Sequence, residues 1–414
     1  MRMLQSIARS LSALPMFRSL HHRNYRLFFF GQLVSLVGTW MQNIGQAWLV
    51  YQLTHSSVWL GAVGFLTSVP VLLFSMFGGT LADKISKKRL ITATQIASMV
   101  QAFILALLVW TDLITPAVVG ILAFTLGMIN AFDMPGRQSF VVEMVGKEDL
   151  QNAIALNSAV FNSARMFGPA VGGIVIGLLG VGWCFFLNGI SFIAVIIGLT
   201  LMNVQERIVP NAESSVIQSI GEGVRYIRSD ATLMAIMTLV AVLTIFGWSY
   251  SVMLPIFADR ILNIGAIGLG NLLTANGIGA LISALTVASF GHKVHPRKFI
   301  YTGLSIFIFS ILIFTASSSP LLSMACMVGI GLGLIAVFAT ANSSLQMRTP
   351  DHLRGRVMGL YSLVFQGFFP IGSLGVGVLA NIVGVRLAVA GGACVCGVSG
   401  GIAYRIMKKK DNRT

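Results

Sequence analysis

Long apolar runs recur from one end of the chain to the other, and this pattern constrains the fold more than any other feature. Each run is close to the about 20 residues that a helix needs to cross the hydrocarbon core of a bilayer. Of the 414 residues, 56% are hydrophobic and only 10% are charged. The runs are continuous, whereas strands of a membrane barrel would alternate polar and apolar residues. The sequence therefore predicts an all-α membrane protein.

Twelve runs are long enough to span a membrane, and a long gap between the sixth and seventh divides them into six and six. The predicted spans are 28–51, 58–81, 91–110, 116–133, 154–179, 181–202, 232–257, 267–290, 299–317, 320–341, 357–381 and 384–406. An offset of 209 residues places Leu90 and Ile91 on Phe299 and Ile300, within matching basic loops after spans two and eight. We therefore expect two pseudo-symmetric six-helix bundles.

The lysines and arginines test this count, because they collect in the cytoplasmic loops of membrane proteins. The N-terminal tail, the loops after even-numbered spans and the C-terminal tail together hold 25 of the 28 cations. Arg165 lies within the fifth span, and Arg260 and Arg386 fall on the opposite side. A missed span would move every later loop to the other side and remove this bias. We expect a multi-pass protein of the cytoplasmic (inner) membrane with both termini in the cytoplasm.

These counts divide the chain into five predicted parts. They are a basic amphipathic tail at 1–27, an N-terminal bundle at 28–202, a cytoplasmic linker at 203–230, a C-terminal bundle at 231–407 and a tail at 408–414. The first tail is rich in arginine and free of acids, as organellar transit peptides are. The helical spacing of Leu4, Ile7, Leu11 and Leu14 favours a helix on an anionic membrane face instead.

Several function classes do not fit this composition. The net charge of +15 is split into short clusters between spans, so nucleic acid is not a predicted partner. The four cysteines lie within apolar runs without redox or zinc spacing, and the six histidines lie outside the spans. No Walker-type phosphate loop and no catalytic constellation is present. We therefore predict neither an enzyme nor a cofactor or metal site, and a monomer whose partners are a small molecule and membrane lipids.

One loop carries a specific signature. The stretch GGTLADKISKKRLI places Gly79, Asp83, Lys84, Lys87 and Lys88 at the spacing G-x-x-x-D-K-x-S-K-K between spans two and three. This loop resembles the signature of the major facilitator superfamily, except that a serine stands where the family usually has glycine. The resemblance implies a gating role for Gly79, Asp83, Lys87 and Lys88. Asp83 would hold the bundles together on the cytoplasmic side by reaching the positive start of span eleven.

A longer segment narrows the resemblance. Residues 130–173, with RNYRLFFFGQLVSLVGTWMQ near span one and LPIFADRILNIGAIGLG near span seven, resemble the subgroup that contains the bacterial enterobactin exporters. Within span five, Gly168, Pro169, Gly172 and Gly173 form GPAVGG, similar to the motif of drug and proton exchangers, where small residues permit close helix packing. Span four lacks the arginine that proton-coupled drug exporters usually carry. Protons thus remain only a candidate coupling ion.

An ionisable residue at membrane depth is a functional candidate, because burying its charge is costly. Arg165 is the only such residue near the predicted midplane, and Asn162 and Ser158 share its helix face. It would either bind an anionic group of the cargo or serve as a structural cation satisfied within the bundle. Both interpretations remain open from the sequence.

Polar residues also line predicted spans one and eleven. Gln32, Ser35, Thr39, Gln42 and Gln46 recur at helical spacing, with Asn43 beside them, and such a stripe avoids lipid. Because first spans of this superfamily line the central cavity, the candidates for cargo binding are Gln42, Asn43, Gln46 and, on span eleven, Gln366. Hydrogen bonding between helices is the alternative.

At the inner end of span four, Asp133 and Arg137 stand at i and i+4. They form either a gating pair or an ordinary ion pair at the interface. Taken with the resemblance, these features predict a secondary active exporter of a small amphipathic molecule, siderophore-like or drug-like, working by alternating access as an ion-coupled antiporter. An importer on the same fold and a transport-inactive scaffold or sensor are the alternatives.

Overall fold

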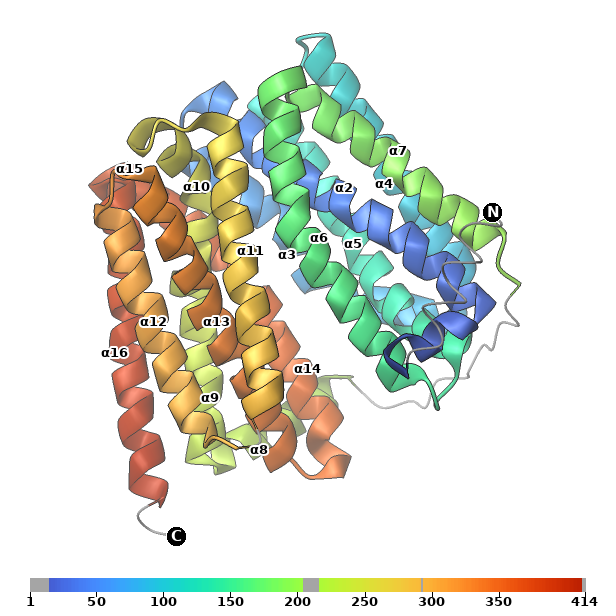
Figure 1. Cartoon of the computed structure of the whole chain (residues 1–414). Helices are drawn as coiled ribbons and strands as arrows, with labels where there is room; N and C mark the ends of the chain where they lie inside the picture. The colour runs from blue at the N-terminus through green and yellow to red at the C-terminus, as the bar shows by residue number, and fades with distance from the viewer. Residues whose placement is uncertain (1–14, 204–215, 292, 412–414) are drawn as a thin grey trace. The chain divides into compact units, whose positions relative to one another are not determined.

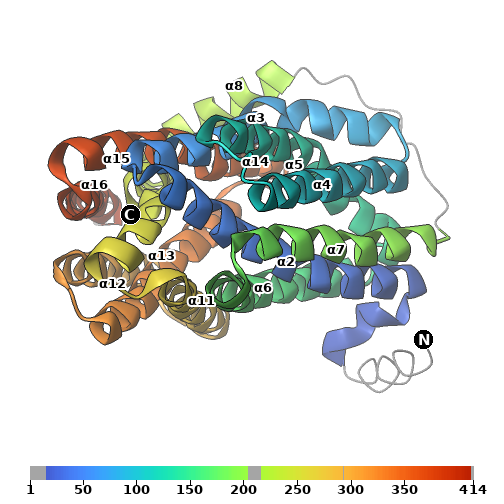
Figure 2. The ribbon, with the colours of Figure 1, turned by 90° about the horizontal axis from the view of Figure 1, so that it is seen from above.

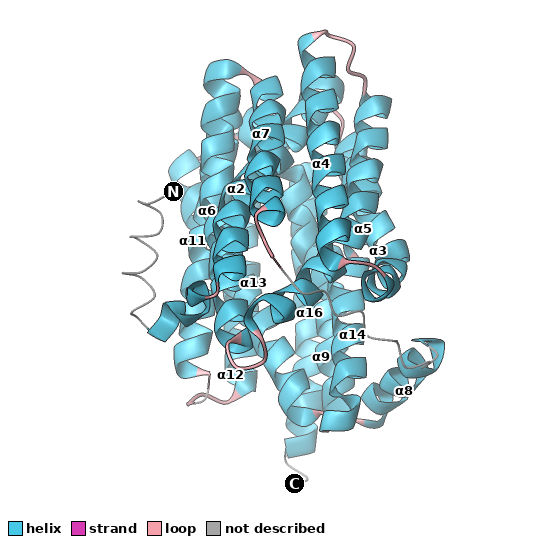
Figure 3. Ribbon diagram, turned by 90° about the vertical axis from the view of Figure 1, so that its right-hand side faces the viewer, coloured by secondary structure: helices cyan, strands magenta, loops and turns pink. Residues whose placement is uncertain are grey.

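The computed structural model describes residues 15–203, 216–291 and 293–411, and the regular elements in these ranges are all helices (Figures 1 and 3). Eleven helical segments in this part of the chain are long and apolar enough to cross a membrane. They are Ser57–Ala82, Lys87–Trp110, Pro116–Val145, Leu150–Leu179, Val181–Thr200, Ala231–Ile261, Gly265–Phe290, Pro296–Ala316, Pro320–Arg348, Asp351–Val383 and Val385–Lys408. Each one contains or largely overlaps one predicted span.

The first predicted span corresponds to α2 (Arg23–Thr54), which does not belong to those eleven. Its 32 residues extend about 48 Å at the rise of an α-helix, which is ample for a bilayer. Its glutamines lower the apolar content, and most of them are buried against other helices rather than facing lipid. All twelve predicted spans are therefore helical in the structure.

The helices pack into two units, each described here by itself. Unit 1 comprises Met1–Leu49 and Pro70–Asn211, and unit 2 comprises Val50–Val69 and Ala212–Thr414. In unit 1, α4 (Lys87–Trp110) lies beside α5 (Pro116–Val145) and α7 (Val181–Thr200), and α6 (Leu150–Leu179) also contacts α7 (Figure 2).

In unit 2, α13 lies between α11 and α12, and α16 packs against α12 and α9 (Figure 2). The α-helices that lie wholly within this unit are α8 (Val216–Ser229), α9 (Ala231–Val242), α10 (Leu254–Ile256), α11 (Gly265–Phe290), α12 (Pro296–Ala316), α13 (Pro320–Arg348), α14 (Asp351–Gly367), α15 (Phe369–Val383) and α16 (Val385–Asp411). Helix α8 lies within the predicted linker and contacts α14, while residues 204–215 lie outside the described residues.

The end of α2 and the first half of α3 (Ser57–Lys84) belong to unit 2, which a division at the linker alone does not predict. The hydroxyl of Ser57 donates to the carbonyl of Gly377 at 2.9 Å. At Gly61, an added Cβ would lie 2.5 Å from the carbonyl oxygen of Ser373. These close backbone approaches to α15 bind residues 50–69 to the second half of the chain.

The residues just before the first predicted span pack into unit 1. Residues Pro15–His21 form a 3-10 helix, η1, and Leu20 is buried in a core cluster that also contains Tyr25, Phe28 and Phe140. Burial of these apolar side chains places residues 15–27 within unit 1. Residues 1–14, where the amphipathic helix was predicted, lie outside the described residues.

Candidate functional site

A buried polar network joins three helices of unit 1. Asp133 on α5 is 1% exposed and forms an ion pair with Arg137 one turn later. The hydroxyl of Thr94 and the amide of Gln95, both on α4, donate to Asp133 Oδ1 at 2.7 and 3.0 Å. Arg137 also donates to Oε1 of Gln32 on α2. The i, i+4 pair expected from the sequence thus exists, but as part of a network rather than as an isolated surface pair.

This network is incompletely satisfied by the residues that the structure describes. Gln32 Nε2, Gln95 Oε1 and Arg137 Nε are buried without a hydrogen-bond partner among them. Two of these atoms are donors and one is an acceptor. Gating by Asp133 and Arg137 stays a prediction.

The signature loop leads directly into α4, which begins at Lys87. Ser86, which stands in the glycine position of the family pattern, caps α4 by accepting a hydrogen bond from the backbone of Arg89 at 3.1 Å. Lys87 pairs with Glu143 of α5 at 2.6 Å, and Lys88 Nζ donates to the carbonyl of Met202 at 2.7 Å. The loop cations thus tie α4 to α5 and to the end of α7.

The other two loop residues are less informative. Gly79 lies within α3, and an added Cβ would meet no atom within 4 Å, so the structure provides no steric reason for glycine there. The side chain of Asp83 lies outside the described residues. Its predicted role as a latch therefore remains a prediction.

Most side chains of the polar stripe on α2 are buried within unit 1. Gln42 is 2% exposed and bonds two other helices, donating to Gln101 at 3.0 Å and accepting from Asn188 at 2.7 Å. Gln46 is buried as well, whereas the neighbouring Asn43 is exposed. In this structure Gln42 serves the interhelix alternative, while Asn43, beside the stripe, is exposed and remains a predicted cargo contact.

Arg165 lies at the middle of α6, and its side chain is half-buried. It interacts with other residues of the chain, so it is not an unpaired cation. Asn162, one turn earlier, is also half-buried and donates to the carbonyl of Ser158 at 2.8 Å. Arg165 and Asn162 therefore form a partly exposed polar patch at mid-helix.

Glycines of the GPAVGG motif bring α6 against α2. A Cβ added at Gly168 would lie 2.5 Å from Trp40 Cβ, and one added at Gly172 would lie 2.5 Å from Ile44 Cγ2. Pro169 and Gly173 are buried beside them. Such distances permit no larger side chain without separating the two helices.

Asp149 holds η1 against the start of α6, a contact that sequence reasoning missed. Its carboxylate lies 2.8 Å from Arg18 Nε and 2.7 Å from His22 Nε2. The hydrogen bond from His22 lowers the pKa of Asp149, partial burial opposes that shift, and the charges of Arg18, His22 and His21 lower the pKa further. The pairing joins residues 127 positions apart, so no local spacing reveals it.

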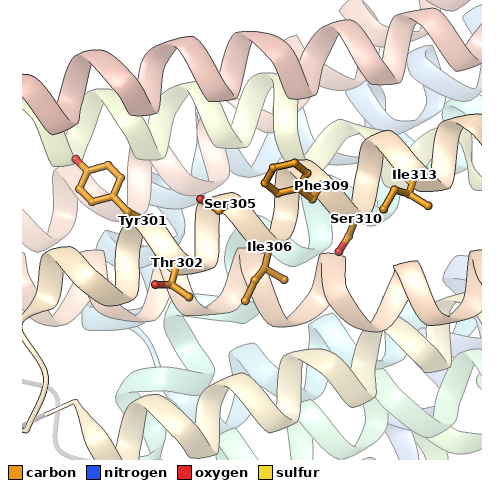
Figure 4. A pocket seen from close by; sticks show the side chains of 7 residues that line it. All are labelled: Tyr301, Thr302, Ser305, Ile306, Phe309, Ser310 and Ile313. Carbon is orange, nitrogen blue, oxygen red and sulfur yellow. The ribbon is translucent and has the colours of Figure 1, made fainter.

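An open groove of about 550 Å³ runs along α12 in unit 2 (Figure 4). One helix supplies the lining: Tyr301, Thr302, Ser305, Ile306, Phe309, Ser310 and Ile313. It contains none of the predicted site residues, and Gln366 is exposed elsewhere, on α14. Among the described residues, no three potential metal ligands gather, and the four cysteines are free.

Comparison with known proteins decides the family. Residues 15–413 match the transmembrane secretion effector family. The chain belongs to this family of major facilitator transporters. It is accordingly a multi-pass membrane transporter rather than an enzyme.

Its relatives include transporters of siderophores and drugs. The staphyloferrin A transporter of Staphylococcus aureus (strain NCTC 8325 / PS 47) is 27% identical over 87% of this chain and 90% of its own. The multidrug efflux pump Tap of Mycolicibacterium fortuitum is 26% identical over 87% of this chain and 90% of its own. The enterobactin exporter EntS of Escherichia coli O1:K1 / APEC is 24% identical over 82% of this chain and 81% of its own.

Solved structures support the fold. A bacterial homolog of the human lysosomal transporter Spinster has a TM-score of 0.74 at 12% identity, covering 94% of this chain and 98% of that one. The nucleoside transporter NupG has a TM-score of 0.69 at 15% identity, and the match covers 93% of this chain and 98% of that one. These similarities establish the major facilitator fold and carry no information on the cargo.

Proposed function

We propose that this transporter exports a small amphipathic organic molecule, siderophore-like or drug-like, across the cytoplasmic membrane by alternating access. The observation that carries the proposal is the near full-length similarity to relatives named as an exporter and an efflux pump. Ion exchange supplies the energy in this proposal, with the proton as the candidate ion. The protein acts as a monomer, and its basic loops and both termini face the cytoplasm.

The polar patch at Arg165 is the proposed contact for an anionic group on the cargo. A guanidinium stays charged in the membrane and presents a planar fork that fits a carboxylate or catecholate. Because Arg165 already interacts within the chain, an anionic cargo would compete with those contacts. Asn162 and the exposed Asn43 and Gln366 are proposed neutral contacts in their respective units.

Efflux measurements test the function. A strain that lacks the protein should accumulate more of its cargo than the same strain expressing it, across a panel of siderophores and drugs. In inside-out vesicles, export appears as uptake into the lumen, and a protonophore should abolish it if protons are exchanged. Release from such vesicles would instead identify an importer, and no flux of any panel member would favour a scaffold.

Substitution of Arg165 tests the proposed cargo contact. Arg165→Lys keeps the charge but loses the bidentate fork, and Arg165→Gln loses both. We expect transport of an anionic cargo to fall partially with lysine, by about tenfold or more with glutamine, and transport of a neutral cargo to change far less. Surface-normalised efflux of one cargo of each kind measures this. Equal losses for both cargos, accompanied by a lower melting temperature, would assign Arg165 a structural role.

A further inference from the structure

The seventh span is irregular at its centre. After α9 ends at Val242, the chain continues as a π-helix, Leu243–Gly247, and then as a 3-10 helix, Trp248–Met253. Pro255 follows in α10 and lacks the amide needed to continue an α-helical ladder. Departures of this kind inside a spanning helix are frequent at functional sites.

Trp248, at the junction of the two irregular segments, joins a cluster of four rings from three neighbouring elements of unit 2. Its ring centroid lies 5.4 Å from Phe338 on α13 and 5.4 Å from Phe365 on α14. Phe338 and Phe365 are 4.9 Å apart, and Tyr361 stacks on Phe365 at 5.9 Å with an interplanar angle of 7°. These distances are those of favourable aromatic contacts.

The four rings divide into a buried layer and a partly uncovered one. Phe338 is 4% exposed and Tyr361 is 6% exposed, and the Tyr361 hydroxyl donates to the carbonyl of Phe338 at 3.1 Å. That bond fixes the two buried rings relative to each other. Trp248 and Phe365 are only half-buried, and Gln366 beside Phe365 is exposed. The cluster therefore presents ring surface, and the next residue along α14 carries an exposed amide that can donate and accept hydrogen bonds.

Ordinary membrane anchoring does not account for Trp248. Unit 1 contains a comparable cluster in which Trp110, the last residue of α4, contacts Trp183 near the start of α7 at 5.3 Å. Tryptophans at helix ends are typical of the aromatic belt at the membrane interface. Trp248, in contrast, is the eighteenth residue of the 31-residue segment Ala231–Ile261, close to its middle. A half-buried indole at that depth lies outside such a belt.

We propose that Trp248 and Phe365 form a ring-binding surface for the cargo, so that the transported molecule carries a flat aromatic ring. The ring would stack on the indole, and its polar substituents would bond Gln366. This inference rests on the proposed function and assigns to it a cargo class, aryl rather than purely aliphatic. Stacking is selective because an aliphatic chain gains no quadrupolar attraction from an indole.

Paired cargos in inside-out vesicles test the assignment. The probes are a catecholate siderophore and an aliphatic hydroxycarboxylate siderophore, together with one aromatic and one aliphatic uncharged drug, so that the members of each pair match in the sign of their charge and no cation–π attraction to the indole arises. We expect Trp248→Leu to raise the apparent KM for aryl cargos about five- to tenfold. Trp248→Phe should restore most of the loss, and aliphatic cargos should be unaffected. Trp110→Leu, in the cluster at the helix ends, is the matched control and should change neither class.

The outcomes separate this inference from the function on which it rests. If the wild-type protein moves no member of the panel, the proposed function fails and the inference fails with it. If it moves aliphatic members only, or if Trp248→Leu impairs both classes equally at an unchanged melting temperature, export stands and the ring-binding surface is rejected. If Trp248→Leu lowers the melting temperature and Trp248→Phe does not restore selectivity for aryl cargos, Trp248 is a packing residue and the inference is again rejected.

Discussion

Asp133 shows how a single acid is kept inside a helical bundle. A carboxylate removed from water is costly unless it is paired and hydrogen-bonded. Asp133 meets that requirement with one ion pair and two donors from α4. The pairing is asymmetric, because 26% of the Arg137 side chain is exposed while Asp133 is enclosed. Solvent thus reaches only the cation.

Replacing Asp133 tests how much this network stabilises unit 1. Asp133→Asn preserves the shape but leaves Arg137 without its counterion, and we expect the free energy of unfolding in detergent to fall by about 2–3 kcal/mol. The matched control is Asp351→Asn, because the Asp351 side chain is 89% exposed in its pair with Arg354. That change should stay within about 0.5 kcal/mol. Similar small effects for both would mean that the network is not stabilising.

Spacing along the chain predicts only part of such a site. Asp133 and Arg137 were paired correctly because i and i+4 share a helix face. The contributions of Gln32, Thr94 and Gln95 were missed, because no periodicity tells which helices become neighbours. The same limit applies to Gln42, whose partners Gln101 and Asn188 lie 59 and 146 residues away. A polar stripe indicates a face that avoids lipid but does not distinguish cargo from another helix.

At the scale of elements, α6 depends on glycine for its approach to α2. Gly168→Ala would place a methyl group 2.5 Å from Trp40 Cβ and 3.0 Å from the carbonyl of Val37. We expect it to lower the free energy of unfolding by about 1–3 kcal/mol, because the helices must move apart. Gly359→Ala is the opposite control, since no atom lies within 4 Å of the added Cβ in α14. It should stabilise by about 0.5–1 kcal/mol through helix propensity, and a loss there would contradict the packing argument.

The docking of η1 on α6 should depend on pH. The pKa of Asp149 is lowered in the folded protein, so its contribution is complete above the unfolded pKa of about 4 and is lost as pH falls through the lower folded value. Ser19 is fully buried beneath this contact. In a variant without native cysteines, Ser19→Cys should resist modification by a dithiodipyridine reagent at neutral pH and be modified by it in strong acid, where this reagent, unlike a maleimide, still reacts with an exposed thiol. Asp149→Asn should make it reactive at every pH, and unchanged protection would assign the docking to Leu20 instead.

The helical elements were more predictable than their connections. About 20 apolar residues bounded by charge are sufficient to locate a span, and even the broken seventh and eleventh spans kept that length. The transition from π- to 3-10 helix at Trp248 was not predicted, because it arises from packing. An added Cβ at Gly372 would lie 2.3 Å from the carbonyl oxygen of Ile245, so α15 approaches the irregular segment at backbone distance. Likewise the serine at the glycine position of the family pattern, Ser86, proved to be a helix cap, which the spacing of the loop did not predict.

At the scale of the whole molecule, the placement of cations specifies how the chain crosses the membrane. The 25 cations on one side of the spans predict that this side is cytoplasmic. Leu113 and Ser319 lie in loops on the other side, Lys147 lies in a basic loop and Lys298 lies in the first turn of α12 after a basic loop, and all four are exposed. The two halves of the chain thus each offer one matched pair of positions.

Cysteine labelling in intact cells tests this topology. In a variant without native cysteines, Leu113→Cys and Ser319→Cys should react with a membrane-impermeant maleimide. Lys147→Cys and Lys298→Cys should react only after the membrane is permeabilised. A missing span would move every later loop to the other side of the membrane. If all four positions label as expected, the chain crosses the membrane an odd number of times between Leu113 and Lys298, as the predicted arrangement requires. Labelling of Lys298→Cys in intact cells, with Lys147→Cys protected, would show an error between spans five and eight. Reversal of all four positions would leave the helices in place and overturn the cytoplasmic assignment of the termini.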